Sequence, residues 1–556
     1  MQDKTEFSLK VRFMEILNAQ SLWENFSPTA EPLEINEFKT VEKDGLVEKH
    51  LYFTGRYFDS VKKTRVYAVV CCKNTKSAKQ AVLFVDDYKR PVNVAELEQL
   101  ARSGFFAMGI DFAGRADCGM YTAYPEELKY CNAKDAKDIF SITTTARETK
   151  LYEYALNCRR AITYIAMQEK IKGISLVSMG RGVFTGMIVM GTETRLTNGA
   201  VLFGALNCEY PEYDGVADTD NAASLNRHLE YDICRQSWTL GLAPQSYAMK
   251  IGIPLYVINS ANSSYVDIEQ INKTGARLNR ECRFLILPNA IDYLSDKYFD
   301  GLVRWLKGAQ VPVPQTLTAF TDANGEYCIK VQTSSSINKT SVWYCSNPVG
   351  RAKYWRSAKL TREGSYYVAR PELYDTENSI MAFSVADRDV VTSTPLFYDN
   401  VQVARPKYVN KNIFSGNGFQ HLIRLDPCNR SMNVDLEQQL AEGYLGIVGA
   451  KGKALATFAI SDSTLCKNAS LTLGLDVCCT VKQKLVVNAV CNFGTEQKET
   501  FSQTIQLDGM GKWQRITVER EKFRRVEDGK QIADDVISLI VLSADEEFIV
   551  NNVFLV

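Results

Sequence analysis

The stretch ISLVSMGRGVFTGM (174–187) joins an apolar run, a turn of small residues and a second apolar run with helical spacing. A strand, a sharp turn and a helix in this order present the residue at the apex of the turn, where a serine would act as a nucleophile. The apex here is Gly180, and the nearest hydroxyl belongs to Ser178, two residues earlier. The turn therefore has the predicted backbone arrangement that presents a nucleophile, but no nucleophilic side chain at its apex.

Charged residues next to this turn could bind a ligand. Arg181 follows the apex at the expected start of the helix, where it could hold an anion together with backbone N–H groups. Asp86 and Asp87 end another predicted strand, AVLFVDD, and Arg181 could instead pair with one of them or with Asp292. We expect the ion pair. Ser178 should face the packed base of the turn.

Histidine, the commonest general base, is rare in this chain. Only His50, His228 and His421 occur. We expect His50 to precede the sheet, His421 to lie in a C-terminal β domain, and His228 to lie in a long insertion of mixed composition. The sequence also has no Walker loop, no dinucleotide fingerprint and no zinc-spaced cluster, so neither a cofactor nor a metal is expected.

The elements that must position these residues alternate in type over residues 49–312. Short apolar strands separated by helices indicate a doubly wound, mostly parallel sheet covered on both faces, which is an α/β fold. The expected strands and helices are strands 65–72, 81–87, 105–114, 200–207, 254–262 and 283–289, and helices 151–166 and 297–308.

The apolar period changes to two after about residue 312, which predicts β structure without long helices. We expect four parts: an N-terminal extension (1–48), an α/β domain (49–312), a small β-sandwich (313–402) and a β jelly roll (403–556). Trp513, Phe523 and Phe548 should belong to the core of the jelly roll.

Net charge, the length of apolar runs and the cysteine count bear on the partners and the location of the protein. The 556 residues contain 65 Lys plus Arg and 65 Asp plus Glu, so no general attraction to nucleic acid or to an anionic membrane follows, and neither is an expected partner. No apolar run is long enough to cross a bilayer, and the first residues do not form a signal peptide. Fifteen scattered cysteines, an odd number, favour reduced thiols and a cytoplasmic location.

Several segments resemble an α/β-hydrolase of the acetyl-xylan-esterase and acyl-esterase type. IDFAGRADCGMYTAYPE (110–126) is similar to a strand and loop of that group, and LNCRRAITYIA followed by GISLVSMGRG is similar to its helix–strand–elbow unit. TSVWYCSNPVGRAKYWRSAKL looks like the β-sandwich often appended to such enzymes. The last strands resemble those of a carbohydrate-binding-module jelly roll.

The resemblance implies a catalytic triad at three positions, and this chain departs from it at each. Gly180 stands where the serine nucleophile is expected, Ser263 where the acid is expected, and Asp292 where the histidine is expected. Asp267 lies four residues after Ser263 and could be a displaced acid. If these assignments are correct, Gly180, Ser263 and Asp292 converge at the C-terminal edge of the sheet.

The oxyanion hole implied by the resemblance is altered as well. It would use backbone N–H groups in the turn that here contains Asp86 and Asp87. A like-charge pair at about 4 Å costs on the order of 1 kcal/mol even in water, and more when desolvated. We therefore expect a catalytically inactive binding or scaffolding protein, whose partner is a small molecule, a carbohydrate or another protein. The alternative is an active carboxylic-ester hydrolase with a rearranged site, with His228 as its base.

Overall fold

A computed structural model of the chain describes most of its residues. The described residues are 15–59, 61–73, 78–88, 90–112, 114, 119–132, 142, 144–207, 233–263, 268–278, 281–288, 296–309, 311–312, 315–333, 339–345, 353, 355–371, 373, 377–402, 412–415, 423–425, 435–436, 439–461, 472–493, 498–532 and 537–555. The chain divides into two compact units. The first comprises Met1–Glu212, Thr219–Leu255 and Thr274–Glu281, and the second Tyr213–Asp218, Tyr256–Lys273 and Cys282–Val556.

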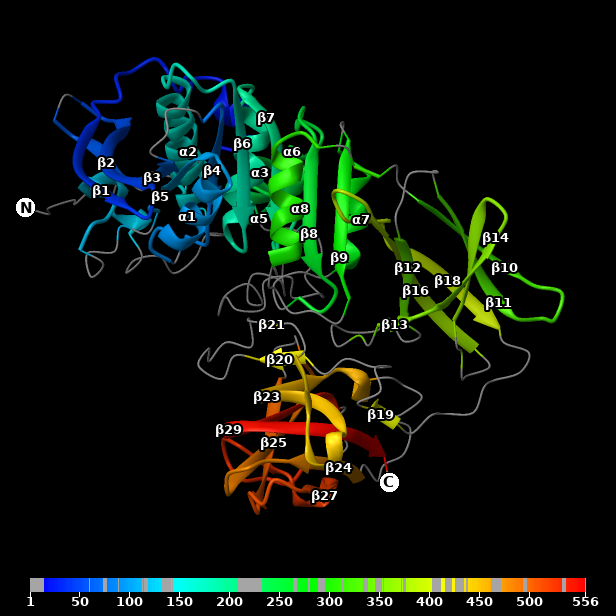
Figure 1. Ribbon diagram of the computed structural model, residues 1–556. Coiled ribbons are helices and arrows are strands. Elements are labelled where there is room, and N and C mark those ends of the chain that lie inside the picture. The colour runs from blue at the N-terminus through cyan, green and yellow to red at the C-terminus, as the bar shows by residue number, and fades with distance from the viewer. Residues whose placement is uncertain are drawn as a thin grey trace, which may run out of the picture. The chain divides into compact units, whose positions relative to one another are not determined.

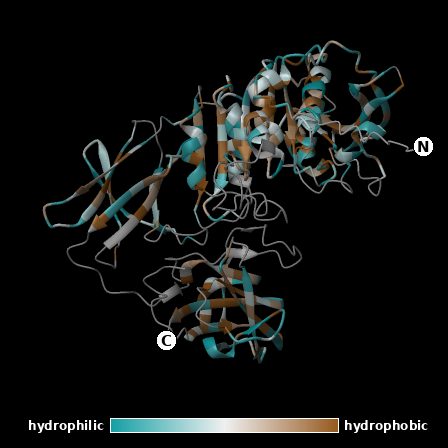
Figure 2. Cartoon of the chain, turned by 180° about the vertical axis from the view of Figure 1, so that it is seen from behind, coloured by the Kyte–Doolittle hydropathy of each residue, from teal (hydrophilic) through white to brown (hydrophobic). Residues whose placement is uncertain are grey.

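The first unit is built on a mixed sheet whose strands follow the order β1-β2-β3-β5-β4-β6-β7 (Figure 1). Its strands are β1 (Asn36–Lys43), β2 (Leu46–Tyr57), β3 (Lys63–Lys73), β4 (Gln80–Val85), β5 (Phe106–Ile110), β6 (Gly173–Met179) and β7 (Leu196–Leu202). The first three pair antiparallel, and β5, β4, β6 and β7 pair parallel. The parallel strands are nearly continuous in apolar residues, as Figure 2 shows, because both of their faces are covered.

Two helices cover opposite faces of this sheet. A side chain at Gly109 would meet Leu97 of α1 (Val94–Arg102), whereas one at Gly55 would meet Asn157 of α2 (Lys150–Ala166). Gly109 is opposite Val69 in the register of β3, and Gly55 contacts Val66. Val66 and Val69 are three positions apart, so they point to opposite faces.

Residues at the ends of the two helices cap them. Asn93 and Thr149 accept hydrogen bonds from backbone N–H groups in the first turns of α1 and α2. Gly104 follows α1 with a φ of +96°, which only glycine adopts readily. The first unit also contains α3 (Gly182–Thr192), α5 (Ile233–Gly241) and α6 (Pro244–Ala248).

The residues before β1 are fastened to α2 by a buried arginine. The Arg160 guanidinium donates hydrogen bonds to the carbonyl oxygens of Pro28, Glu31, Pro32 and Thr54, at 2.7–3.0 Å. Four neutral acceptors surround the charge, which offsets part of the cost of burying it.

The strand order identifies the α/β-hydrolase fold. After the antiparallel β2 and β3, the strands β5 and β4 exchange places, and β6 and β7 continue in chain order. Beyond β7, the N–H of Gly199 donates to the carbonyl of Pro254 just before β8, and that of Leu255 donates to Glu281 just before β9. The predicted α/β class is confirmed.

The second unit contains most of β8 (Leu255–Ser260) and α7 (Glu269–Gly275), followed by β9 (Cys282–Leu287) and α8 (Asp296–Leu306). Leu255 of β8 and the last two residues of α7 belong to the first unit. Two sheets of a β-sandwich follow. One has the order β10-β11-β15-β14, and the other contains β12, β13, β16, β17 and β18 and joins β9 through the pair Ser393–Phe284. Their bounds are β10 (Thr316–Thr321), β11 (Tyr327–Gln332), β12 (Lys339–Cys345), β13 (Arg356–Ser357), β14 (Lys359–Glu363), β15 (Tyr366–Arg370), β16 (Glu377–Asp387), β17 (Thr392–Ser393) and β18 (Phe397–Gln402).

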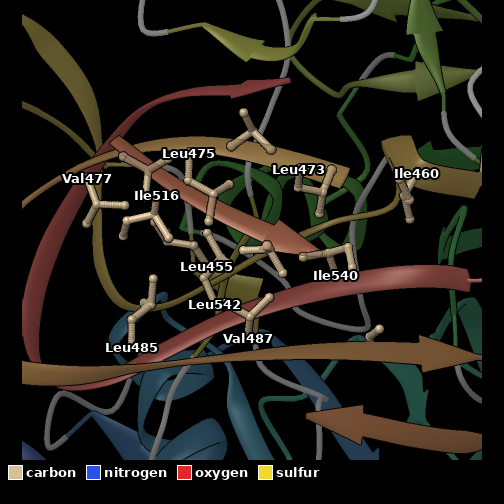
Figure 3. Close-up of a cluster of buried hydrophobic side chains, with 14 of the residues drawn as sticks. Leu455, Ile460, Leu473, Leu475, Val477, Leu485, Val487, Ile516, Ile540 and Leu542 are labelled. Atoms are coloured by element: carbon tan, nitrogen blue, oxygen red, sulfur yellow. The ribbon is translucent and has the colours of Figure 1, made fainter. Parts of the chain in front are cut away.

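Strands β19 to β29 form a β domain at the C-terminal end of the chain. They are β19 (Asn412–Ser415), β20 (Ile423–Leu425), β21 (Asp435–Leu436), β22 (Gln439–Glu442), β23 (Val448–Thr457), β24 (Thr472–Cys478), β25 (Gln483–Cys491), β26 (Glu499–Leu507), β27 (Trp513–Glu519), β28 (Arg524–Arg525) and β29 (Ile537–Leu555). The long β29 pairs with β25 along its first part, with β24 along its second part, and with β23 across both. Figure 3 shows the aliphatic core that these strands enclose. Among the described residues after 312, helical structure is limited to three-residue 3-10 turns.

Two of the sequence-based expectations were wrong. His50 does not precede the sheet: it lies within β2, because the sheet begins with β1 at Asn36. Phe523 and Phe548 are buried in the C-terminal core as expected, but Trp513 is only half-buried, because it begins β27 at the end of the domain. No helix in the described part of the chain is long and apolar enough to span a membrane.

Candidate functional site

The turn between β6 and α3 has the geometry of a nucleophile elbow with glycine at its apex. Gly180 has a φ of +56°, and its N–H donates to the carbonyl of Leu202 at 2.9 Å. A Cβ at Gly180 would meet no atom of the described residues within 4 Å, so the apex is open on the side that they define. The apex therefore has room for a side chain and has none.

Gly182 allows α3 to begin directly against β4. A Cβ at this position would lie 2.5 Å from the carbonyl oxygens of both Val85 and Asp86. Real Cβ atoms do not approach backbone that closely, so only glycine fits. This contact holds the start of α3 beside the turn that contains the two aspartates.

Ser178 lies below the turn and points into the protein. Its side chain is fully buried, and its Oγ donates to the carbonyl of Ala200 at 3.5 Å. A Cβ at Gly186 of α3 would lie 2.4 Å from the Ser178 Cβ, so helix and strand are in close contact there. In this position the hydroxyl supports packing between β6, β7 and α3, and it does not reach the open side of the apex.

Asp86, Asp87 and Arg181 form a buried charged group beside the apex. The Arg181 Nη1 lies 3.6 Å from the Asp87 Oδ2, and both side chains are less than one-tenth exposed. The ion pair expected from the sequence is thus present with Asp87. Because the pair is buried, it is screened less than a surface pair would be.

The Asp86 carboxylate accepts a hydrogen bond from the backbone of its own turn. The N–H of Asp87 donates to the Asp86 Oδ1 at 2.7 Å. Burial raises the pKa of Asp86, although this hydrogen bond and the charge of Arg90 lower it. Burial, and then the charge of Asp86, also raise the pKa of Glu96 in α1. The N–H of Asp87, which the resemblance would assign to an oxyanion hole, is therefore already used, and its acceptor is a carboxylate.

The remaining sequence-predicted site residues lie in the second unit or outside the described residues. Ser263 is buried after β8, and its N–H donates to the carbonyl of Ser260, but it belongs to the second unit. Asp267, Asp292 and His228 lie outside the described residues. The convergence of Gly180, Ser263 and Asp292 stays a prediction.

His50 is too far from the elbow to serve as its base. In the sheet order, β2 and β6 are four strand spacings apart, which is about 19 Å at 4.8 Å per spacing. The His50 Nδ1 lies 2.6 Å from the Tyr67 hydroxyl, and its Nε2 lies 2.6 Å from the Glu48 Oε1. His50 is 4% exposed, so its ring is closed in by these neighbours, although the contact of Nε2 with Glu48 lacks hydrogen-bond geometry.

Sequence reasoning missed this Glu48–His50–Tyr67 group. The signal was the spacing of two between Glu48 and His50, which places both on one face of a strand. Tyr67 could not be added from the sequence, because its place depends on the register between β2 and β3, in which Tyr67 is opposite Tyr52. Within the described residues, no cluster of three or more His, Cys, Asp or Glu side chains could hold a metal ion.

Part of the chain matches a family profile, and about half of it aligns with solved structures. Residues 239–352 match the profile of a family described as PhoPQ-activated pathogenicity-related protein. A search of curated protein sequences gives no match. Solved structures that align include an acetyl xylan esterase from Paenibacillus sp. R4, at 13% identity and a TM-score of 0.38, covering 52% of this chain and 92% of that one.

Two further solved structures align over a similar share of this chain. Acetyl xylan esterase 1 from Thermoanaerobacterium sp. JW/SL YS485 aligns at 14% identity and a TM-score of 0.37, over 50% of this chain and 87% of the other. The acylaminoacyl peptidase of Pyrococcus horikoshii aligns at 10% identity and a TM-score of 0.34, over 49% of each chain. The fold assignment rests on the strand order of the sheet.

Proposed function

We propose that this chain is a catalytically inactive α/β-hydrolase-like protein that uses the region around its elbow for binding or scaffolding. The observation that carries the proposal is Gly180 at the open apex, in the position of a nucleophile. Serine hydrolysis needs a nucleophile, a base and an orienting acid in hydrogen-bond contact. At the apex of this chain the nucleophile is missing, and His50 is held about 19 Å away by the sheet spacing.

The charges beside the apex favour a ligand that donates hydrogen bonds. Asp86 and Asp87 are both buried, and Arg181 is paired with Asp87. Carboxylates accept hydrogen bonds from hydroxyl groups and oppose a developing oxyanion. A carbohydrate or another small polyhydroxylated molecule therefore suits this group better than an acyl ester does. A protein partner is the other binding role consistent with an inactive elbow.

A covalent probe tests the absence of catalysis. We expect no fluorophosphonate labelling of the intact protein above that of a heat-denatured sample, and no turnover of p-nitrophenyl acetate or butyrate. The variants Ser178→Ala and Ser263→Ala serve as matched controls, since both serines are buried. Labelling or turnover abolished by one of these substitutions would support the alternative, an active carboxylic-ester hydrolase with a rearranged site.

The ligand class is tested by calorimetric titration with xylo-oligosaccharides. We expect binding that weakens at least tenfold in Asp86→Asn, because the amide both loses the charge and presents a donor. The matched control is Asp389→Asn, whose carboxylate is 61% exposed. Equal affinity in both variants and the wild type would contradict a carbohydrate site at Asp86. It would not be evidence for catalysis.

We also propose that the protein resides in the cytoplasm. The ten cysteines within the described residues are all free thiols, and eight of them are buried, as suits a reducing compartment. Burial raises the pKa of Cys71 to about 12 and that of Cys282 to about 12, which keeps these thiols protonated and unreactive. Mass spectrometry without reductant should find no defined disulfide, and several well-formed bridges would contradict the assignment.

A further inference from the structure

The C-terminal β domain concentrates its exposed apolar side chains at one end. Among the described residues from 439 to 555, the exposed large apolar side chains are Leu440, Tyr444, Leu445, Ile447, Val481, Met510 and Val526. All except Val526 belong to three loops or to the strand that leads into one of them. We call these the tip loops: residues 443–447, 479–482 and 508–512.

Backbone contacts hold the tip loops together. The Gly511 N–H donates to the carbonyl of Cys479 at 2.8 Å, and a Cβ at Gly509 would lie 2.1 Å from the Lys482 nitrogen. On the other side, the Trp513 Nε1 donates to the carbonyl of Tyr444 at 2.9 Å. The three loops therefore form one continuous surface.

Each loop presents an apolar side chain at its tip. Leu445 is 79% exposed, Met510 is 72% exposed and Val481 is 48% exposed. Leu445 also has a φ of +60°, in the left-handed region that costs a leucine free energy. Backbone strain of this kind persists at sites of binding more often than elsewhere.

From these observations we infer that the tip loops dock on a lipid bilayer interface. Aliphatic side chains on separate tips insert between lipids one by one, and no matching protein groove is needed. Tyr444 belongs to a tip loop and Trp513 adjoins one, and aromatic residues of this kind favour the headgroup region. Lys482, Lys484 and Lys512 are exposed around the tips, next to Glu442 and Asp508, so anionic headgroups add a modest attraction.

The chemistry of the tips disfavours a sugar as the occupant. Sugars are bound by flat, exposed aromatic rings with polar groups around them. Here Gly443 covers one face of the Trp513 ring, since a Cβ there would lie 2.6 Å from its Cζ2. The balanced charge of the whole chain argues against general electrostatic adhesion to membranes, but it does not bear on local insertion.

Sedimentation with vesicles tests this docking on the full chain. The vesicles are phosphatidylcholine alone and a three-to-one mixture of phosphatidylcholine and phosphatidylserine. We expect wild type to bind both and to prefer the mixture. The double variant Leu445→Asp, Met510→Asp should bind at least tenfold less, because two charges would enter the apolar region. Aspartate tolerates a positive φ better than leucine does, so the fold should persist.

A matched control comes from the same domain. Val526 is 64% exposed, and its N–H donates to the carbonyl of Thr500, at the opposite end of β26 from the tip loops. Val526→Asp should bind vesicles as wild type does. Absence of wild-type binding to both vesicles, or an equal loss in both variants, would overturn the inference. So would a dimer or soluble-xylan binding that depends on Leu445 and Met510 in place of vesicle binding.

Discussion

The elbow after β6 has some features of an active site, and the region around β2 has others. The elbow has an open apex, a glycine with positive φ and a helix that starts beside it. Its apex carries no nucleophile, and the histidine that the structure describes, His50, lies in β2. Around β2, an acid, a histidine and a hydroxyl are in contact, yet His50 and Tyr67 are buried and Glu48 is only 22% exposed. Reactive residue types alone therefore do not make a site, because access and placement at the sheet edge are also required.

A second buried pair beside β2 supports this contrast. Glu153 of α2 is fully buried and pairs with Arg56 of β2. Burial raises the pKa of Glu153 to about 7, against the opposing charge of Arg56. A perturbed pKa often marks a functional site, but structural ion pairs perturb pKa values too. Both groups near β2 are better explained as structural. We therefore expect changes near β2 to alter stability, and changes at the elbow to test catalysis.

Removing His50 should have the largest effect, on stability alone. His50→Ala leaves a cavity and deprives both Glu48 and Tyr67 of a buried partner, which should cost roughly 4 kcal/mol. Tyr67→Phe removes one hydrogen bond and should cost about 1 kcal/mol. Urea unfolding followed by tryptophan fluorescence measures both. Equal, near-zero changes would show that this group does not stabilise the fold, and would reopen the question of its role.

Glu153 should make the stability of the first unit depend on pH. Its folded pKa, about 7, lies above its ordinary value of 4.5, so the folded state holds the proton more tightly. The resulting stabilisation is complete below about pH 4.5 and is lost as pH rises through 7, a change of roughly 3 kcal/mol at most.

The comparison of wild type with Glu153→Gln isolates this contribution. The glutamine variant keeps the shape but cannot titrate, so its stability relative to wild type should increase between pH 5 and pH 8. Denaturant midpoints measured across that range provide the test. Parallel curves for the two proteins would mean that Glu153 keeps the same charge throughout.

The sequence predicted the elements and the elbow, because both depend on local patterns. Helical spacing located α2, apolar runs located β4 and β6, and Gly180 marked the apex. The sequence did not predict contacts between strands or between a strand and a helix. The His50–Tyr67 and Arg56–Glu153 contacts depend on register and on helix packing between residues 17 and 97 positions apart. Trp513 was assigned to the core from its apolar character, but its place at a strand end leaves it half-exposed.

Gly182 should tolerate substitution less well than the apex two residues earlier. Gly182→Ala pushes a methyl group against the Val85 and Asp86 carbonyl oxygens, which cannot rotate away. Overpacking of this kind costs roughly 2 kcal/mol. Thermal unfolding of the variant measures the loss, and Gly252→Ala, at an exposed position with open space and no positive φ, is a control for the effect of adding a methyl group. A neutral Gly182→Ala would mean that α3 can move away from β4.

The smallest effect is expected at the apex itself. A Cβ at Gly180 would meet none of the described residues within 4 Å, so Gly180→Ser should cost only the positive φ, about 1 kcal/mol. The new hydroxyl would stand where a nucleophile stands, which makes this variant the most direct test of the comparison. We expect its turnover of p-nitrophenyl acetate to remain at the background rate.

The reason lies in what surrounds the apex. His50 is held in β2 by Glu48 and Tyr67, about 19 Å away by the sheet spacing, so it cannot accept the serine proton. The Asp87 N–H is bonded to the Asp86 carboxylate, so it is not free to stabilise an oxyanion. Turnover of about 1–1000 per second, as in an ordinary enzyme, would show that a base and an oxyanion hole act at this apex. The elbow would then need only its nucleophile, and the inactive-hydrolase proposal would be wrong.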